Sequence, residues 1–367
     1  MTTFRRPEPF TKNGVTRAIP AELGETEGGQ VRCRICVRGC LLNHEQVGFC
    51  SAVVHWNHRL YSLAYGVVAE LNVSPIEERL FHTIVGAPML SIGGVGCNLR
   101  CLFCLNWDIA FRDASRGNGL DTPNLAPEDA VDLAIRNGCE GIDWSHNEAT
   151  ISPAYVRDVA DQAKQRGLLT CLVTNGLMSD ATLDFLGPYI DGYRVDVKSL
   201  DSAFYRQLAH LPGPVDPLRS AHRAQQDYGM RVEVFTNLMP GYSDADDHIR
   251  RIADRILDDL GQETPWHLTS YVPYAHMKHV PPTPPATLER ARNIARERGL
   301  WYVYTDSLTD PSAANTYCPA CSALLVERLP NGVRISDVLL DGACSKCGQA
   351  INITISQSIS RREGLGA

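Results

Sequence analysis

Three cysteines, Cys97, Cys101 and Cys104, lie within eight positions of the segment GGVGCNLRCLFCLNW, which begins at Gly93. Thiolates hold zinc ions and iron-sulfur clusters, and such sites commonly take four protein ligands. A cluster of four irons bound by only three thiolates keeps a vacant position on one iron, which a small molecule can occupy. The alternatives are a zinc site completed by a distant histidine or cysteine, and cysteines that only pack.

Two further groups of four cysteines flank this segment. The pairs Cys318/Cys321 and Cys344/Cys347 are separated by 22 residues, which is close to the spacing of a zinc ribbon. We expect structural zinc there rather than an auxiliary iron-sulfur cluster. The N-terminal group can close either a structural zinc site or an auxiliary 4Fe-4S cluster, and its spacing does not decide between them. This group consists of Cys33, Cys36, Cys40 and Cys50.

The thirteen cysteines also bear on the cellular compartment. The N-terminus lacks the apolar run of a secretory signal, and the chain has no stretch of ~18 consecutive apolar residues. A reducing cytoplasm keeps thiols free for metals, so we expect a cytoplasmic protein without disulfides or a membrane partner. The isolated Cys139 and Cys171 are expected to be buried small apolar residues. The net charge of -7 and the pI near 5.9 speak against a nucleic-acid partner.

Short apolar strands alternate with amphipathic helices along most of the chain. Leu60 to Leu71 has the β-branched and aromatic content of strand pairing. Further strands are expected over 88–96, 141–149, 168–176, 191–199, 230–241, 266–273 and 301–306. Helices are expected over 126–138, 153–166, 179–187, 244–261 and 287–299. Six strand-then-helix units in a row predict a parallel sheet, with the chemistry at the carboxyl ends of its strands.

This pattern predicts an α/β fold built around a partial (βα)6 barrel of the TIM type. We expect an N-terminal cysteine-rich cap over residues 1–85, the barrel over 86–310, and a C-terminal zinc-ribbon-like module over 311–367. The loop with the three cysteines follows the first barrel strand, so it is expected at the end of the barrel where the site lies.

Polar residues follow four of the expected strands, in the segments SHNEAT, VTNG, VDVK and LMPGYSD. An Asn-Gly pair after a strand is often only a turn, and Asp-x-Lys on one face of a strand is often a surface ion pair worth under ~1 kcal/mol. Four such strand ends in sequence, beside a three-cysteine loop, instead indicate a shared binding site.

Together these segments give the chain a resemblance to a known superfamily. The pattern CNLRCLFC, with Asn98 and Phe103 between the cysteines, resembles the cluster-binding loop of the radical S-adenosylmethionine (SAM) enzymes. The likeness extends from CRICVRGC at Cys33 through CLNW, NEAT, TNG, VDVK, MPGYSD and PPTP to the terminal cysteine pairs. It is strongest to relatives of pyruvate formate-lyase activating enzyme, and among these to the subgroup that occurs alongside AMMECR1-like and Memo-like proteins.

The resemblance implies specific cofactor contacts. Cys97, Cys101 and Cys104 would bind a 4Fe-4S cluster whose fourth ligand is SAM, through its amino and carboxylate groups. A carboxylate suits an ammonium group and a lysine suits a carboxylate, which agrees with an Asp-x-Lys pair at the methionine moiety. The residues that would contact or line the path of SAM are Asn147, Glu148, Asn175, Gly176, Asp196 and Lys198.

The implied activity is that of a radical SAM oxidoreductase. The reduced cluster would cleave SAM to methionine and a 5′-deoxyadenosyl radical, which takes a hydrogen atom from a substrate. No catalytic side chain beyond the cluster is assigned. His146, His267, Tyr271, His276 and Cys171 lie near expected strand ends, where a structural role is the more common one. The implied partners are an electron donor such as flavodoxin or ferredoxin and an unidentified substrate, with a protein among the candidates.

Two other functions fit parts of the sequence. The first is an activase that takes hydrogen from a glycine of a partner protein, a glycyl-radical enzyme. The second is a scaffold or binding protein in which all eleven clustered cysteines hold zinc, and which has no iron.

Overall fold

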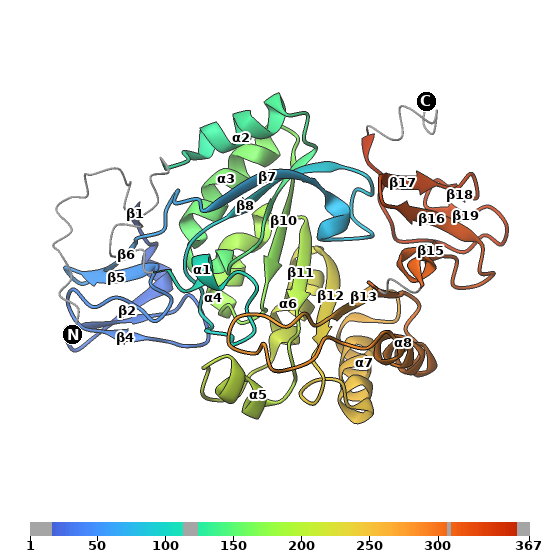
Figure 1. Cartoon of the computed structure of the whole chain (residues 1–367). Helices are drawn as coiled ribbons and strands as arrows, with labels where there is room; N and C mark the ends of the chain where they lie inside the picture. Colours follow the sequence, from blue (N-terminus) through green and yellow to red (C-terminus); the bar gives the residue numbers. More distant parts are fainter. Residues whose placement is uncertain (1–16, 113–123, 307–309, 358–367) are drawn as a thin grey trace. The chain divides into compact units, whose positions relative to one another are not determined.

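The computed structural model describes residues 17–112, 124–306 and 310–357 (Figure 1). The first 16 and last 10 residues of the predicted cap and C-terminal module lie outside this range. Its contacts divide the chain into two compact units, which are described separately. The first comprises Met1–Val73, Met89–Asp191 and Ser202–Val215; the second comprises Ser74–Pro88, Gly192–Asp201 and Asp216–Ala367.

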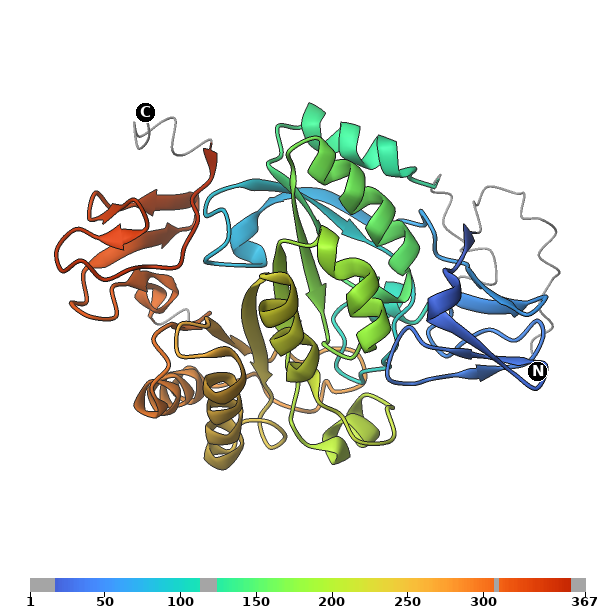
Figure 2. The same ribbon diagram turned by 180° about the vertical axis from the view of Figure 1, so that it is seen from behind.

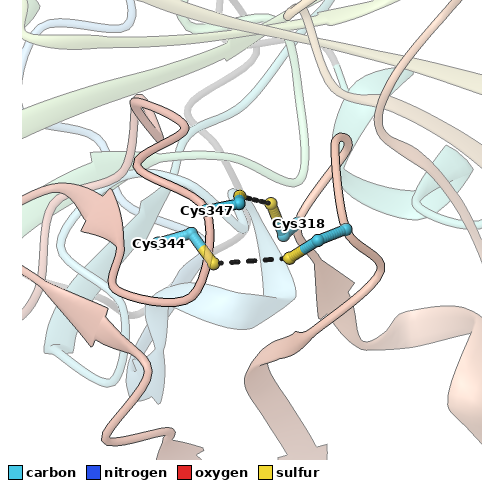
Figure 3. Close-up of side chains that lie close together, drawn as sticks. Cys318, Cys344 and Cys347 are labelled. Carbon is cyan, nitrogen blue, oxygen red and sulfur yellow. Dashed lines mark hydrogen bonds between the residues drawn. The ribbon is translucent and has the colours of Figure 1, made fainter.

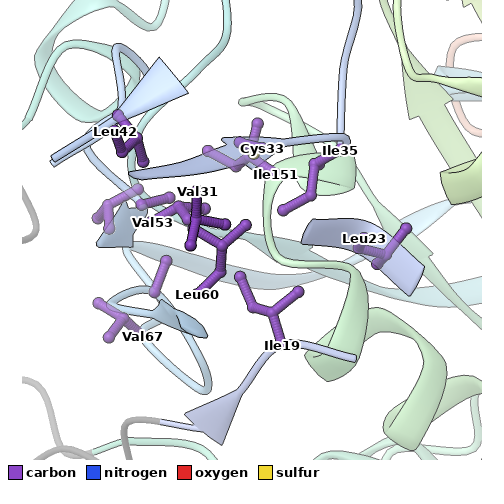
Figure 4. Close-up of a cluster of buried hydrophobic side chains, with 13 residues drawn as sticks. Ile19, Leu23, Val31, Cys33, Ile35, Leu42, Val53, Leu60, Val67 and Ile151 are labelled. Carbon is purple, nitrogen blue, oxygen red and sulfur yellow. The ribbon is translucent and has the colours of Figure 1, made fainter. Parts of the chain in front are cut away.

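The first unit begins with small antiparallel sheets. One has the strand order β2-β3-β4 and the other β1-β6-β5. Buried apolar side chains of these strands pack with Ile151, and the thiol of Cys33 lies among them (Figure 4). The elements are β1 (Arg17–Ala18), η1 (Ala21–Leu23), β2 (Gly24–Glu27), β3 (Gln30–Cys33), β4 (Leu41–Leu42), β5 (Val53–Trp56) and β6 (Arg59–Ser62).

Parallel strands form the rest of the first unit. β8, β9 and β10 are neighbours in chain order, with Met89 and Leu169 both opposite Gly141. Helix α3 lies against β9 and β10, with α2 and α4 beside it (Figure 1). The elements are β7 (Glu70–Pro75), β8 (Pro88–Gly93), α1 (Trp107–Ala110), α2 (Pro127–Arg136), β9 (Gly141–Trp144), η4 (Ala149–Ile151), α3 (Pro153–Gln165), β10 (Leu169–Thr174), α4 (Asp180–Leu186), η5 (Gly187–Tyr189) and α5 (Ser202–Leu208).

The second unit contains another set of parallel strands, again in chain order. β12 pairs with β11 on one side and with β13 on the other, and β14 follows β13. Helices α6, α7 and α8 pack in a row against these strands (Figure 2). The elements are η2 (Ile76–Glu78), β11 (Gly192–Asp196), α6 (Pro217–Tyr228), β12 (Arg231–Leu238), α7 (Asp246–Leu260), β13 (Trp266–Ser270), α8 (Pro285–Arg298) and β14 (Val303–Thr305).

The C-terminal part of the second unit is a small antiparallel module. Its strands form the sheets β15-β16-β17 and β18-β19 around a core that includes Cys318 and Cys344. Val85, from the segment before β8, packs into the same core and pairs with Ile355. The elements are η6 (Pro311–Ala314), β15 (Thr316–Tyr317), β16 (Leu324–Leu329), β17 (Gly332–Ile335), β18 (Leu339–Leu340) and β19 (Ala343–Cys344).

Proline and glycine mark the ends of the main helices. Prolines occupy the first turn of α2, α3, α6 and α8, where no intrahelical N–H bond is lost. After α6 and α8, Gly229 and Gly299 adopt φ angles of 66° and 114°, which a residue with a Cβ rarely takes. For α2, α3 and α8 these signals agree with the predicted helix ranges, whereas α6 carries the same signals and was not predicted.

The mixed α/β fold, consistent with a partial barrel, confirms the predicted fold class. The strand content expected from Leu60 to Leu71 is divided between two strands. β6 ends at Ser62 and β7 begins at Glu70, and between them Gly66 turns the chain with a φ of 71°. Helices α5 and α6 were not predicted. Among the described residues, no helix has the length and apolar character needed to cross a membrane.

Arg328 of β16 links the C-terminal module to the segment before β8 within the second unit. Its guanidinium donates to the carbonyl oxygens of Phe81 (2.6 Å) and Ala314 (2.9 Å) and to the hydroxyl of Thr316 (2.9 Å). It also stacks 3.8 Å from the centre of the Phe81 ring. Burial lowers the pKa of Arg328. The side chain therefore satisfies acceptors from three separate parts of this unit.

Replacing Arg328 with methionine should lower the free energy of unfolding by about 2 to 4 kcal/mol, because buried acceptors lose a charged donor. Urea unfolding followed by circular dichroism measures the change. Arg334→Met is the matched control on β17, since the Arg334 side chain is 67% exposed and pairs only at the surface with Glu327. It should change stability by less than about 0.5 kcal/mol. Equal losses of unfolding free energy in the two variants would show that the buried contacts of Arg328 do not stabilise this unit.

Candidate functional site

The three-cysteine loop follows β8 and leads into the short helix α1. Backbone hydrogen bonds hold it at several points. Gly96 N donates to Ile109 O (3.0 Å), and Arg100 N and Leu102 N donate to the carbonyls that end α5. Cys104 N donates to Cys101 O (3.1 Å), which closes a tight turn between the last two cysteines. The loop is thus held in a defined shape by the first unit alone.

The three thiols of this loop lie close enough to affect one another. Burial raises the pKa of the Cys97 thiol, and Glu148, Cys101 and Cys104 raise it further. The backbone N–H of Leu99 points at Cys97 Sγ at 3.4 Å. Thiols buried together resist losing their protons, because the thiolate charges would repel one another. A bound cation offsets this repulsion when it takes the sulfur atoms as thiolates. N–H groups aimed at sulfur are typical of iron-sulfur sites. The donor set therefore fits the three-thiolate cluster that the sequence predicts.

Asn147 braces the start of the loop from the end of β9. Its Oδ1 accepts from Gly94 N (2.9 Å), and its Nδ2 donates to Gly96 O (2.9 Å). Next to it, His146 has a φ of 69°, and its carbonyl accepts from Asn106 Nδ2 (2.7 Å). Left-handed backbone at a non-glycine residue is strained, and such strain concentrates at functional sites. The two ends of the loop are thereby joined to the same strand end.

Glu148 ties the end of β9 to the end of β10. Its side chain is buried and accepts from the hydroxyls of Thr150 (2.6 Å) and Thr174 (2.8 Å) and from Asn175 N (2.8 Å). Burial raises the pKa of Glu148, while these hydrogen bonds act in the opposite direction. Such bonds offset much of the cost of burying a carboxylate. Glu148 therefore holds the ends of β9 and β10 together and also places a carboxyl group close to Cys97.

Asn175 completes the connection to the cluster loop. Its Nδ2 donates to Asn98 Oδ1 (2.6 Å), and its Oδ1 accepts from Leu177 N (3.1 Å). Gly176 follows with a φ of 76°. The structure thus brings Asn147, Glu148, Asn175 and Gly176 together around the loop, as the sequence predicts. The side-chain atoms of the first three serve the protein's own hydrogen bonds, and their contact with SAM stays a prediction.

Asp196 and Lys198 belong to the second unit, at the end of β11. Lys198 Nζ lies 3.9 Å from Asp196 Oδ2, and Arg194 Nε donates to Asp196 Oδ1 at 2.9 Å. Burial alone would raise the pKa of Asp196, but Arg194 and Lys198 hold it below the ordinary value. Arg194 also stacks 3.6 Å from the centre of the Phe235 ring. The sequence analysis missed Arg194, although its position two residues before Asp196 puts both on one strand face.

Two of the other candidates near strand ends, His267 and Tyr271, have structural partners. His267 Nε2 lies 2.6 Å from Glu233 Oε2, and Tyr271 donates to Met277 O (2.7 Å). Cys171 is buried in β10, His276 is exposed, and Cys139 is buried, as predicted for an isolated cysteine. These positions agree with the structural roles that the sequence analysis preferred.

The four N-terminal cysteines also gather in one place within the first unit. Burial raises the pKa of the Cys33 thiol, and Cys50, Cys36 and Cys40 raise it further. Burial and Cys50 likewise raise the pKa of Cys36 to about 12. The backbone turns between them, with Gly39 N donating to Cys36 O (3.1 Å) and Cys33 N to Cys40 O (2.8 Å). This arrangement suits a four-thiolate metal site, whose metal stays a prediction.

The C-terminal cysteines form a compact group in the second unit (Figure 3). Their sulfur atoms all lie within 4.8 Å of one another. Cys318 Sγ is 3.5 Å from Cys347 Sγ, and Cys321 Sγ is 3.6 Å from Cys344 Sγ. Cys318 and Cys344 are buried, whereas Cys321 and Cys347 are exposed. Four thiols at these distances can hold a metal ion.

The fold and the three-cysteine loop define a class of cluster-binding α/β proteins, and comparison with known families agrees. Residues 91–256 match the model of the radical SAM superfamily. These residues therefore form a radical SAM domain. Such a domain implies a 4Fe-4S cluster and SAM as cofactors.

Similar proteins include both uncharacterized and named relatives. An uncharacterized protein of Methanocaldococcus jannaschii is 34% identical over 331 residues, which cover 90% of this chain and 97% of the relative. The pyruvate formate-lyase 1-activating enzyme of Escherichia coli K12 is 27% identical over 220 residues, covering 56% of this chain and 87% of that enzyme. A solved domain of a pyruvate-formate lyase-activating enzyme from Bacteroides vulgatus has 17% identity and a TM-score of 0.39, covering 45% of this chain and 98% of that domain.

The cluster loop passes close to the backbone of Cys50 at Gly96, and this contact predicts the effect of adding a methyl group there. Gly96 has a φ of 85°, and a Cβ there would lie 2.4 Å from Cys50 O. Gly96→Ala should therefore displace the loop and reduce the iron and sulfide bound after anaerobic reconstitution. Iron and sulfide analysis per chain measures the loss.

Gly138→Ala is the matched control, because Gly138 has a φ of 68° with no atom near the added Cβ. It carries the same backbone strain, of about 1 kcal/mol, without the clash. It should retain full iron. Iron contents that fall equally in both variants would mean that the approach to Cys50 does not position the loop.

Proposed function

We propose that this protein is a radical SAM oxidoreductase in which Cys97, Cys101 and Cys104 hold a 4Fe-4S cluster with SAM on its fourth iron. The observation that carries the proposal is the loop itself. It supplies three adjacent thiols and is joined by Asn147 and Asn175 to two neighbouring strand ends. The superfamily match supports the same cofactors.

The chemistry belongs to the cofactors, and the chain positions them. When bound and reduced, the cluster supplies the electron that cleaves SAM to methionine and a 5′-deoxyadenosyl radical, which takes a hydrogen atom from the substrate. The braced strand ends keep the loop rigid, so that bound SAM meets a fixed iron. In the proposal, Asn147, Glu148, Asn175 and Gly176 line the SAM site. The resemblance further assigns Asp196 to its ammonium group and Lys198 to its carboxylate, and both contacts stay predictions.

The substrate is proposed from the named relative. The Escherichia coli protein is named as the activating enzyme of pyruvate formate-lyase 1, which is itself an enzyme. This likeness favours a protein substrate, and an activase of a glycyl-radical partner is the second candidate function. A small electron-transfer protein such as flavodoxin or ferredoxin would reduce the cluster. The proposal includes a cytoplasmic location, where thiols stay reduced.

The superfamily match favours this enzyme over a zinc scaffold. The C-terminal group is nevertheless proposed as structural zinc. Thiolates ~2.3 Å from a tetrahedral zinc lie about 3.8 Å apart, whereas a 4Fe-4S cubane carries its four thiolates on separate irons. The separations of 3.5 Å and 3.6 Å between the two pairs of sulfur atoms are close to this zinc arrangement and support the proposal.

Replacing Cys97, Cys101 and Cys104 together with alanine should abolish SAM cleavage, because no thiolate remains to hold the cluster. The measurement is 5′-deoxyadenosine formed anaerobically with dithionite and SAM. Cys139→Ala is the control, since Cys139 is buried away from any cysteine group of the sequence, and it should retain cleavage. Undiminished cleavage by the triple variant would refute the cluster assignment.

Replacing Cys321 and Cys347 with serine should remove one zinc per chain and leave the cluster iron unchanged, because these exposed thiolates belong to the C-terminal group. Metal analysis of the anaerobically purified protein provides the readout. Ser322→Ala, within the same knuckle, should keep its zinc. Loss of iron rather than zinc from the double variant would assign a cluster to this site.

A further inference from the structure

Two arginines lie between the N-terminal cysteines and the cluster loop of the first unit. Arg38 belongs to the turn between Cys36 and Cys40, and its guanidinium reaches the cluster loop. Nε donates to Asn98 O and Nη2 to His210 O, each at 2.5 Å. Its position therefore depends on both the cysteine turn and the loop.

Arg100 reaches in the opposite direction, from the cluster loop toward the N-terminal segment. Its guanidinium donates to Cys97 O (2.7 Å) within the loop and to Phe49 O (2.9 Å) beside Cys50. Both arginines meet the Phe49 ring, at 3.4 Å for Arg38 and 4.9 Å for Arg100. The two side chains thus join the same pair of segments.

The charge of this pair is not balanced by carboxylates. Within the described parts of the chain, the partners of both guanidiniums are carbonyl oxygens, one hydroxyl and the rings of Phe49 and Phe111, and no ion pair to Asp or Glu is found for them. Both side chains are half-buried. Arginine stays protonated in such surroundings, so two cations require a nearby negative charge.

With metals bound as proposed, the thiolates of the two cysteine groups would supply that negative charge. Arg38 is two residues from both Cys36 and Cys40, and it donates to the carbonyl oxygen of Asn98, the residue after Cys97, so its charge lies beside both groups. Three thiolates on a 4Fe-4S cluster leave a net negative charge, which increases by one when the cluster takes up an electron. A fixed cation nearby stabilises the reduced form more than the oxidised form.

We propose that Arg38 is a positioning residue of the cluster loop and that its positive charge raises the reduction potential of the cluster at Cys97, Cys101 and Cys104. This inference rests on the proposed cluster. The step it concerns is a one-electron reduction by a low-potential donor, without bond breaking or proton transfer. The N-terminal cysteine turn holds the charge in place, and Arg100 adds a second cation on the loop itself.

The test is the midpoint potential of the cluster in the reconstituted full chain, without SAM, from a dithionite titration followed by electron paramagnetic resonance. Arg38→Gln should retain its iron and show a lower potential than the wild type. Arg38→Lys, which keeps the charge, should stay close to the wild type. Arg34→Gln is the control in the same segment, because Arg34 is 52% exposed and pairs with Glu25, and it should leave the potential unchanged.

A wild-type potential in fully loaded Arg38→Gln would overturn the proposal, and so would equal shifts in Arg38→Gln and Arg38→Lys. If Arg38→Gln binds too little iron for full loading, the resonance signal of its loaded fraction decides, because that signal comes only from chains that hold a cluster: a lowered potential supports the charge effect, and a wild-type potential overturns it. The proposed function fails separately. A wild type that holds a redox-active cluster and does not cleave SAM would refute that function and leave the potential measurement valid.

Discussion

The buried carboxylate of Glu148 is the interaction on which the geometry of the cluster loop depends. It collects hydrogen bonds from the end of β10 and lies close enough to Cys97 to raise its pKa. An anion beside three thiolates is unfavourable unless cations compensate for it. Arg38 and Arg100 lie near the same loop, and the proposed cluster irons add further positive charge. Around the three cysteines, the negative charges of Glu148 and the thiolates are therefore offset by the two arginines and the proposed irons.

Much of the fold could be predicted because its signals are local. Strands such as β8 and β10 are short and rich in apolar residues, and helices such as α3 and α8 begin with proline. Helix α6 was missed because the preceding segment, PGPVDP, suggests an extended loop, although Pro217 begins the helix. The composition of Leu60 to Leu71 indicates strand pairing without showing the turn at Gly66, because an apolar composition does not reveal where a chain turns.

The site could be predicted only in part, for a related reason. The cysteine spacing is a local pattern, and the strand ends that surround the loop follow from the order of a parallel sheet. The bonds that use Asn147 and Asn175 as braces depend on partners 51 and 77 residues away, which spacing does not reveal. The partners of Arg38 are even farther away in the sequence, because one of its acceptors, the carbonyl oxygen of His210, is 172 residues along the chain. Long-range contacts of this kind come only from the three-dimensional structure.

The central claim is that the cluster leaves one iron for SAM to bind. Pulsed electron-nuclear double resonance of the anaerobically reduced protein, with SAM labelled with ¹⁵N in its amino group, measures this directly. The account predicts a ¹⁵N coupling to the cluster that is absent with unlabelled SAM. A spectrum that does not respond to the label, with the cluster fully loaded and SAM bound, would show that another ligand occupies that iron and would contradict the account.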